Sequence, residues 1–229
     1  MLLIFTHKVT NRLTYTAKQI FEKILGVEIG FTTKVEDFIK HSGPKMTYSK
    51  QPLQNEFFIR SNDLLFEQGI NDLEVKISDW DGIPCFFSSG DKSTIPFDVF
   101  SASFFLLSRY EEYLPHVKDS VGRFPVKESI AYQNNFLELP VVDLWAYKLL
   151  EVLKLRFPDL ESREKNYRFT SIINVTTSHA YAMRGIARTI GGFLLDLGNF
   201  KFRNVWERFS VILRLKKDPY DNFFELVDI

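Results

Sequence analysis

An α/β fold first becomes recognisable in "LLIFTHKVTNRLTYTAKQIFEKILGVEIGFTT", residues 2–33. The apolar run over residues 2–7 predicts a first strand, and residues 27–33 alternate in the manner of a second. Between these strands, apolar side chains recur at helical spacing over residues 12–26, and Gly26 is typical of a helix end. A β-α-β opening of this kind predicts an α/β domain.

The chain that follows continues the pattern with shorter pieces. Residues 34–43 predict a short helix that ends at a glycine, and residues 44–95 hold several strand-like segments separated by Gly, Pro, Asn and Asp. Within them "DWDGIP" (residues 79–84) is typical of a turn, which predicts a hairpin or a loop between two strands. We therefore expect a mixed sheet in this part of the protein.

Two longer helices and a polar linker are predicted next. Residues 96–115 predict a buried helix with Asp98 placed to cap it, and residues 139–157 predict a second helix with a proline near its first turn. The stretch "PDLESREKN" is rich in charge and poor in apolar residues, as domain boundaries often are. The predicted parts are an N-terminal α/β domain at 1–157, a linker at 158–166 and a further segment at 167–229.

Composition excludes several classes of protein. The 229 residues include 29 Lys and Arg against 29 Asp and Glu, so there is no basic footprint of a nucleic-acid binder and no nucleic-acid partner is expected. No apolar run approaches the length of a membrane span, and the apolar N-terminal stretch is too short for a signal peptide. Cys85 is the only cysteine, so a disulfide framework is excluded and a cytoplasmic location is expected.

Sequence spacing predicts no metal site. The four histidines are scattered at positions 7, 41, 116 and 179, without an H-x-x-x-H or HExxH spacing. Phosphate-binding loops and the serine-nucleophile motif G-x-S-x-G are also missing.

One cluster of charged residues leaves two interpretations open. Arg109 and Glu112 stand three residues apart and can pair on a helix surface, next to Glu111. Asp119 and Arg123 follow in a polar stretch that predicts a loop. A local ion pair that organises the helix end explains these residues, but the same groups could serve an enzyme whose site lies wholly within the N-terminal domain.

Near residue 170, "YRFTSIINVTTSHAY" predicts a strand followed by polar residues. Catalytic carboxylates and metal ligands of α/β enzymes often stand at the carboxyl end of such a strand. Here the polar residues include Asn174 and Thr176, and no acid is present.

Several phrases taken together resemble a known family. In order along the chain they are "DVFSASFFLLSRYEEYLP", "DSVGRFPVKESIAY", "NNFLELPVVDLWAYKLLEVL", "AYAMRGIARTIGGFLLDL" and "KKDPYDNF". They are similar to phrases of bacterial polysaccharide deacetylase family proteins, mostly of the Bacteroidetes. Those proteins carry an N-terminal domain of unknown function, followed by a NodB-homology domain of the carbohydrate esterase family four type. The resemblance extends over essentially the whole chain.

The resemblance implies a fold, a cofactor and two site positions. The family's deacetylase domain is a distorted (β/α) barrel that holds a divalent metal such as zinc, with an Asp-x-Asp at the end of the first strand. Aligned on Ala180-Tyr181 and Gly185, Asn174 and Thr176 occupy the positions of those two aspartates. Neither is an anionic ligand or a base near neutral pH, so we expect no cofactor and no catalysis by this chain alone. The segment after Tyr167 is too short for a closed barrel, which predicts an incomplete one.

The function expected from these observations is that of a polysaccharide deacetylase-like protein that is not catalytic. Its alternative is an interaction module that binds a glycan or a protein partner of envelope polysaccharide machinery. Apolar faces of the C-terminal segment also predict self-association, through residues that a complete barrel would cover. These residues include Phe193, Leu194, Trp206, Phe209 and Ile212.

Overall fold

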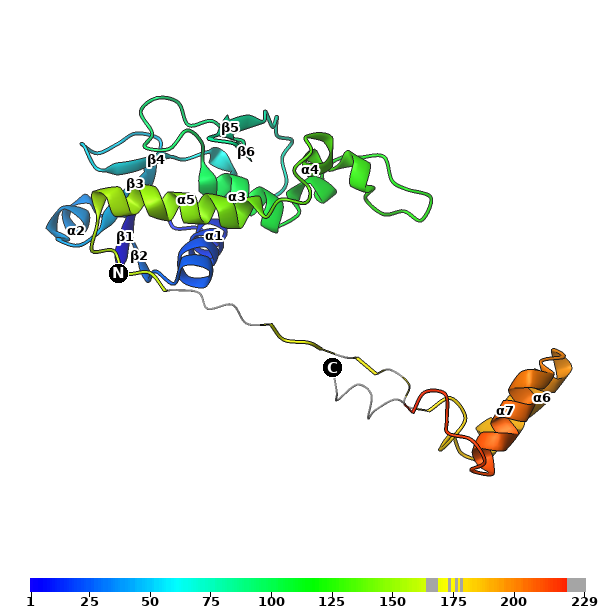
Figure 1. Ribbon diagram of the computed structural model, residues 1–229. Coiled ribbons are helices and arrows are strands. Elements are labelled where there is room, and N and C mark those ends of the chain that lie inside the picture. Colours follow the sequence, from blue (N-terminus) through cyan, green and yellow to red (C-terminus); the bar gives the residue numbers. More distant parts are fainter. Residues whose placement is uncertain (164–168, 173, 176, 178, 222–229) are drawn as a thin grey trace. The chain divides into compact units, whose positions relative to one another are not determined.

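The computed structural model describes residues 1–163, 169–172, 174–175, 177 and 179–221 (Figure 1). The chain forms two units, Met1–Asn166 and Tyr167–Ile229. The first unit contains every strand found in the described residues, and the described part of the second forms two helices.

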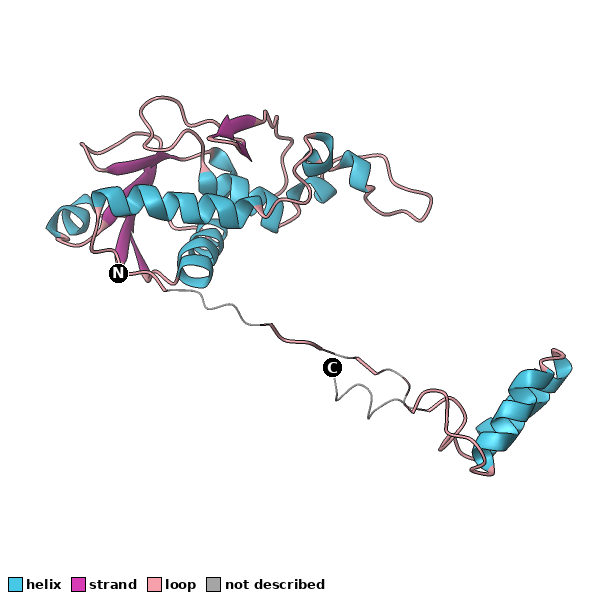
Figure 2. Ribbon diagram, viewed as in Figure 1, coloured by secondary structure: helices cyan, strands magenta, loops and turns pink. Residues whose placement is uncertain are grey.

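The centre of the first unit is a sheet of four strands (Figure 2). The strands are β1 (Leu2–Phe5), β2 (Ile29–Thr32), β3 (Lys45–Ser49) and β4 (Phe57–Arg60). Their order is β2-β1-β3-β4, and each neighbouring pair is parallel. The expected α/β class is therefore confirmed, but this sheet is parallel throughout and the prediction of a mixed sheet was wrong.

Helices cover both faces of the sheet, and alternate residues of β1 show how. Leu2 and Ile4 point into the large core formed with the helices α1, α3 and α5, whereas Leu3 and Phe5 contact Phe38. Figure 1 shows α5 crossing in front of the strands. The helices of the large core are α1 (Asn11–Lys18), α3 (Val99–Leu107) and α5 (Val141–Arg156), and the small helix α2 (Val35–Lys40) carries Phe38. A π-helix, η1 (Gln19–Leu25), continues α1.

Gly26 ends this first helical segment, as the sequence predicts. Its φ of 66° lies in the left-handed region that favours glycine. A Cβ at this position would lie 2.4 Å from the Cβ of Arg163, whose backbone N donates to the Leu25 carbonyl at 3.1 Å. Gly26 therefore allows the chain after α5 to pack against the end of η1.

Asp98 caps α3 as expected, but the helix is shorter than the predicted span of 96–115. The carboxylate accepts the backbone N–H groups of Phe100 and Ser101, both at 3.1 Å. After α3 the backbone of Arg109 turns into the left-handed region with φ 53°, and a 3-10 helix, η3 (Tyr110–Tyr113), follows. The remaining short helices of this unit are η2 (Asp63–Leu65), η4 (Val126–Glu128) and α4 (Ile130–Gln133).

The "DWDGIP" stretch forms the predicted hairpin. The strands β5 (Ser78–Trp80) and β6 (Ile83–Cys85) pair antiparallel, apart from the main sheet. The two turn residues, Asp81 and Gly82, both have positive φ, as a type I′ hairpin turn requires. Trp145 of α5 donates its indole N–H to the Pro84 carbonyl at 3.0 Å, which fixes the hairpin on the core.

The second unit contains α6 (Ile186–Gly198) and α7 (Phe202–Ile212), which pack against each other. The strand predicted near residue 170 was wrong for the residues that can be assessed, since 169–172 and 174–175 lie in no strand. Phe169 and Ile172 are largely exposed, so no neighbouring strand covers them. Within the described residues this unit forms no barrel, and no helix of those residues has the length and apolar character needed to cross a bilayer.

Candidate functional site

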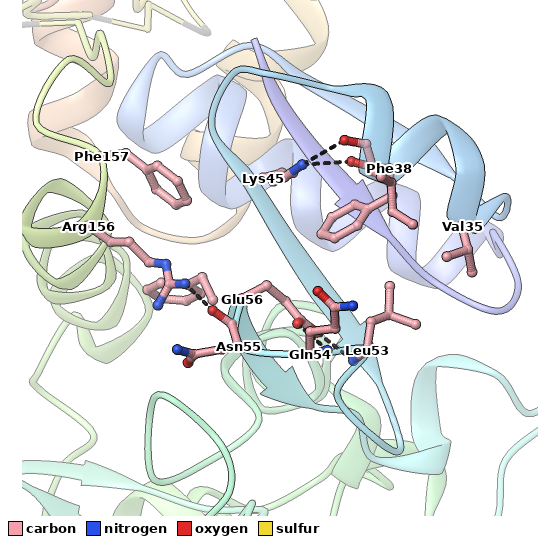
Figure 3. A pocket seen from close by; sticks show the side chains of 11 residues that line it. Val35, Phe38, Lys45, Leu53, Gln54, Asn55, Glu56, Arg156 and Phe157 are labelled. Carbon is pink, nitrogen blue, oxygen red and sulfur yellow. Dashed lines mark hydrogen bonds between the residues drawn. The ribbon is translucent and has the colours of Figure 1, made fainter.

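A cavity of about 420 Å³ opens beside the amino ends of β3 and β4 (Figure 3). Its volume lies within the range of small-molecule sites. The lining comes from α2, from the β3–β4 connection and from the last turn of α5. The lining residues are Val35, Phe38, Ile39, Lys45, Leu53, Gln54, Asn55, Glu56, Phe57, Arg156 and Phe157.

Lys45 joins α2 to the sheet at one side of the cavity. Its ammonium donates to the carbonyls of Phe38 at 2.9 Å, Ile39 at 3.3 Å and His41 at 2.7 Å. These are carbonyls at the carboxyl end of α2, where a cation is favoured by unpaired backbone oxygens and by the helix dipole. The same ammonium lies 5.2 Å from the centre of the Phe38 ring. Lys45 is therefore a positioning residue that fixes the α2 side of the cavity.

Glu56 shapes the opposite side. Its two carboxylate oxygens accept the backbone N–H groups of Leu53 and Gln54, each at 2.7 Å. Burial by itself raises the pKa of Glu56, but these backbone hydrogen bonds outweigh it and hold the pKa below its usual value. The carboxylate thus stays ionised and folds the loop back on itself, which turns the Gln54 side chain outward to the cavity rim.

Arg156 and Phe157 close the cavity from the end of α5. The Arg156 guanidinium donates a hydrogen bond to the Asn55 carbonyl, which connects residues that are 101 positions apart. Figure 3 shows Arg156 and Phe157 on the α5 side and Phe38 and Lys45 on the α2 side. The exposed side chains Gln54, Asn55 and Arg156 form a polar rim over an apolar floor that includes Phe38 and Phe57.

This arrangement suits binding rather than proton transfer. The accessible apolar side chains of Val35, Ile39, Leu53 and Phe157 offer contact surface, and the rim offers amide and guanidinium groups that form hydrogen bonds in fixed planes. Glu56 is the only carboxylate among the lining residues, and its lowered pKa keeps it unprotonated near neutral pH. It is thus a poor general acid, and its oxygens already accept two backbone N–H groups.

A second hollow lies near the carboxyl end of β1, where ligands of open parallel sheets often bind because the strand order reverses there. It measures about 440 Å³ and is lined by residues 8–12 and 66–69. Arg12 lines this hollow, but both terminal nitrogens of its guanidinium already donate hydrogen bonds. One donates to the Leu64 carbonyl at 2.8 Å and the other to the Gly69 carbonyl. The hollow offers less apolar surface than the first cavity, so the first fits an organic ligand better.

Tyr48 and Asp98 form a buried polar pair below these strand ends. The Tyr48 hydroxyl donates to Asp98 at 2.8 Å, and the backbone N–H of Asn62 donates to the same carboxylate oxygen at 2.6 Å. Burial raises the pKa of both groups; hydrogen bonds to the carboxylate oppose that rise for Asp98, whereas the neighbouring Asp98 charge adds to it for Tyr48. Since both carboxylate oxygens accept internal donors, this pair connects β3 to α3 and is a structural feature.

Of the two positions that the resemblance aligns with metal-binding aspartates, the structure describes one. Asn174 is exposed, and Thr176 lies outside the described residues. A neutral amide in place of a carboxylate does not fit a divalent ion that needs anionic ligands. Within the described residues, no three His, Cys, Asp or Glu side chains gather in a way that could hold a metal.

Asp218 brings together two of the phrases on which the resemblance rests. Its carboxylate accepts the backbone N–H groups of Ala180 at 2.7 Å, Tyr181 at 2.8 Å and Ala182 at 2.9 Å, and of Tyr220 at 3.0 Å. Burial raises the pKa of Asp218, but the four backbone donors outweigh it and lower the pKa to about 2. "AYAMRG" and "KKDPYD" are therefore one structural feature, which the sequence alone did not indicate.

The charged residues singled out from the sequence in the first unit form separate interactions and not one cluster. Arg109 pairs with Glu112, Glu111 accepts the backbone N–H of Ile130 at 2.9 Å, and Arg123 lies 3.2 Å from Asp119. The backbone N–H of Arg123, with those of Val121 and Gly122, lowers the pKa of Asp119. Among the described residues, no hydrogen bond or ion pair joins the Arg109–Glu112 pair to the Asp119–Arg123 pair.

The structure defines a layered α/β domain with a cavity suited to binding, followed by a helical unit. The chain belongs to the family of unknown function DUF7033, which matches residues 2–158. The match ends close to the carboxyl end of α5 and so covers the sheet, its helices and the cavity. The chain matches no curated protein and no solved structure.

Proposed function

We propose that this protein is a non-catalytic, polysaccharide deacetylase-like protein whose DUF7033 domain binds a glycan in the cavity between α2 and α5. The observation that carries the proposal is the composition of the cavity, an apolar floor under a polar rim. The relation to deacetylases rests on the resemblance of the phrases along the chain.

A sugar ring presents an apolar C–H face and an edge of hydroxyl groups. Ile39 and Phe157 supply accessible apolar surface for the face, and Gln54, Asn55 and Arg156 supply hydrogen-bonding groups for the edge. An N-acetyl substituent adds one methyl group, one carbonyl and one N–H, which the same mixture of groups can accept. A cavity of about 420 Å³ has space for one or two sugar rings.

The proposed lack of catalysis is supported by residue chemistry. Asn174 carries an amide where the resemblance implies a carboxylate, and an amide neither takes up a proton near neutral pH nor binds a divalent cation strongly. The groups around the cavity do not replace that function, since the Glu56 carboxylate is already bound to the backbone of its own loop.

Isothermal titration calorimetry with N-acetylated chito-oligosaccharides tests the binding proposal. We expect saturable binding by the wild-type chain and at least a fivefold weaker affinity for Gln54→Ala, because one rim donor and acceptor is lost. Gln68→Ala is the matched control, since Gln68 is an exposed glutamine beside the second hollow. Equal affinities for the wild type and Gln54→Ala, or no binding at all, would overturn the assignment of the cavity.

A separate assay tests the absence of catalysis. The purified chain is incubated with the same oligosaccharides and zinc, and released acetate is measured with and without a chelator. We expect no acetate above the background of a protein-free control. Acetate release that is abolished by chelation would show a working metal site and would refute the non-catalytic part of the proposal.

A further inference from the structure

The α6–α7 pair has its polar side buried and its apolar side exposed. The buried residues of α7 are Arg208, Ser210 and Val211, and α6 has none. By contrast Trp206 is 70% exposed and Phe209 is 50% exposed. A helix pair that stabilised itself would bury the aromatic residues and expose the arginine.

The contact between the two helices explains this arrangement. The Arg208 guanidinium lies against Gly192, where a Cβ would come within 2.6 Å of it, and so uses the space that a side chain on α6 would need. Its charge is neutralised by Asp196 of α6 at 2.6 Å, and it lies over the Tyr181 ring at 4.9 Å. This polar contact holds the two helices together, and the apolar side chains of each helix face away from it and are exposed.

The exposed apolar side chains of α6 and α7 form one apolar surface across both helices. Ile190 and Phe193 of α6 and Phe209 and Ile212 of α7 line a shared hollow of about 260 Å³. Further exposed apolar side chains extend it along the pair. They are Ile186, Leu194, Leu197, Phe202, Trp206 and Leu213.

The second unit also carries an excess of cations. Residues 169–221 contain eight Arg and Lys against four Asp and Glu, whereas residues 1–163 contain 19 against 22. Three of the four carboxylates are engaged, since Asp196 pairs with Arg208, Glu207 pairs with Lys216, and Asp218 accepts backbone N–H groups. Seven of the eight cations are exposed, and five of them lie in a helix or within two residues of one, namely Arg184, Arg188, Lys201, Arg203 and Arg214.

We propose that the α6–α7 pair binds the surface of a membrane that contains anionic lipids. Amphipathic helices with Trp, Phe and Leu on one face and Arg and Lys around it lie in the interfacial plane of such membranes. The apolar residues enter the boundary between headgroups and acyl chains, and the exposed cations meet the anionic headgroups. The excess positive charge argues for a lipid surface over a second copy, because two such units would repel each other.

Vesicle binding by the full chain tests this proposal. Sedimentation with vesicles of phosphatidylcholine and phosphatidylglycerol at 3:1 should carry the protein into the pellet, and pure phosphatidylcholine should carry far less. Trp206 gives a second signal, since Trp80 and Trp145 are buried at 8% and 0% exposure. We expect a blue shift of its fluorescence on binding, and quenching by lipids brominated on their acyl chains. Trp206→Phe should remove both signals while vesicle binding persists.

Substitutions separate the charge contribution from the apolar one. Each cation near an anionic surface strengthens binding about fivefold. The double variant Arg188→Gln, Arg203→Gln should therefore weaken partitioning about twentyfold or more. Trp206→Gln should weaken it about tenfold, because the largest exposed ring no longer enters the interface. Leu155→Gln is the matched control, since Leu155 is 85% exposed on α5 of the other unit, and it should change nothing.

Three results would overturn the proposal. The first is sedimentation that does not depend on phosphatidylglycerol. The second is equal partitioning of the wild type and the Arg188→Gln, Arg203→Gln variant. The third is a concentration-dependent dimer without lipid, dissociated by Trp206→Gln and unable to bind vesicles, which would show that a second copy covers this face.

Discussion

Replacing Asp218 by Asn is expected to separate the "AYAMRG" turn from the end of the helix pair. In the native chain each Asp218 oxygen accepts two backbone N–H groups, Oδ1 those of Ala180 and Tyr220 and Oδ2 those of Tyr181 and Ala182. Asparagine keeps one oxygen and presents an NH₂ group in place of the other. Two backbone donors would then face a donor, so their hydrogen bonds are lost.

The pKa of Asp218 gives the magnitude. It is lowered from 3.8 to about 2 in the folded chain, because the four backbone donors outweigh burial. This difference corresponds to about 2.5 kcal/mol, and solvent screening near the surface reduces it to about 2 kcal/mol, which the ionised carboxylate contributes to local stability at neutral pH. Because the folded-state pKa is depressed, this contribution is fully present above about pH 4 and is lost as the pH falls toward 2.

Hydrogen exchange measures this contribution directly. We expect the protection of the amides of Ala180, Tyr181 and Ala182 to fall about thirtyfold in Asp218→Asn, which corresponds to about 2 kcal/mol. Asp221→Asn, three positions along the same segment, is the control and should leave them protected. Unchanged protection in Asp218→Asn would refute the reasoning, as would a loss of protection in the wild type centred near pH 4 instead of pH 2.

Three further predictions concern the first unit and are tested by urea unfolding. Gly26→Ala should lower the free energy of unfolding by about 2–3 kcal/mol, because Gly26 has a positive φ and a Cβ there would collide with Arg163. At Gly122 the φ is also positive but a Cβ would meet no atom, so Gly122→Ala should cost only the backbone strain, about 1 kcal/mol. Equal losses would contradict the contact. Asp98→Ala should cost about 3 kcal/mol, since it removes the α3 cap and leaves the buried Tyr48 hydroxyl without its acceptor, while Tyr48→Phe should cost about 1 kcal/mol. Lys45→Met should cost about 1 kcal/mol and should raise amide exchange in α2, because the last carbonyls of that helix lose their cation; slow exchange in that variant would refute the positioning role.

Local signals were enough to predict much of the first unit. An apolar run located β1, helical spacing located the helix after it and alternation located β2, and Gly26 and Asp98 act at the helix ends where their chemistry places them. The hairpin followed from Asp81-Gly82, since few other pairs adopt two positive φ angles at low cost. The direction of strand pairing was harder to predict, because the sequence of a short strand does not indicate whether its neighbours run parallel to it. The prediction of a mixed sheet was therefore wrong.

Two errors have a common physical cause. The helix expected over 96–115 ends at Leu107 because Arg109 leaves helical geometry, although its side chain still pairs with Glu112 as the spacing suggested. The strand expected near residue 170 has an apolar sequence but no neighbour in the described residues, and Phe169 is 76% exposed. Both predictions used local spacing, whereas helix length and strand formation also depend on what packs against the segment.

The cavity shows most clearly what sequence spacing leaves out. Lys45 and Arg156 bind backbone carbonyls of other segments, Glu56 binds backbone N–H groups of its own loop, and none of the three stands in a motif. Arg156 looks like an ordinary basic residue in the last turn of a helix, and its contact with Asn55 exists only because α5 packs beside the sheet. The rim side chains are therefore placed by tertiary packing. If the cavity binds a sugar, its specificity depends on the α2 and α5 ends holding their positions, so variants of Lys45 should alter affinity without touching the ligand.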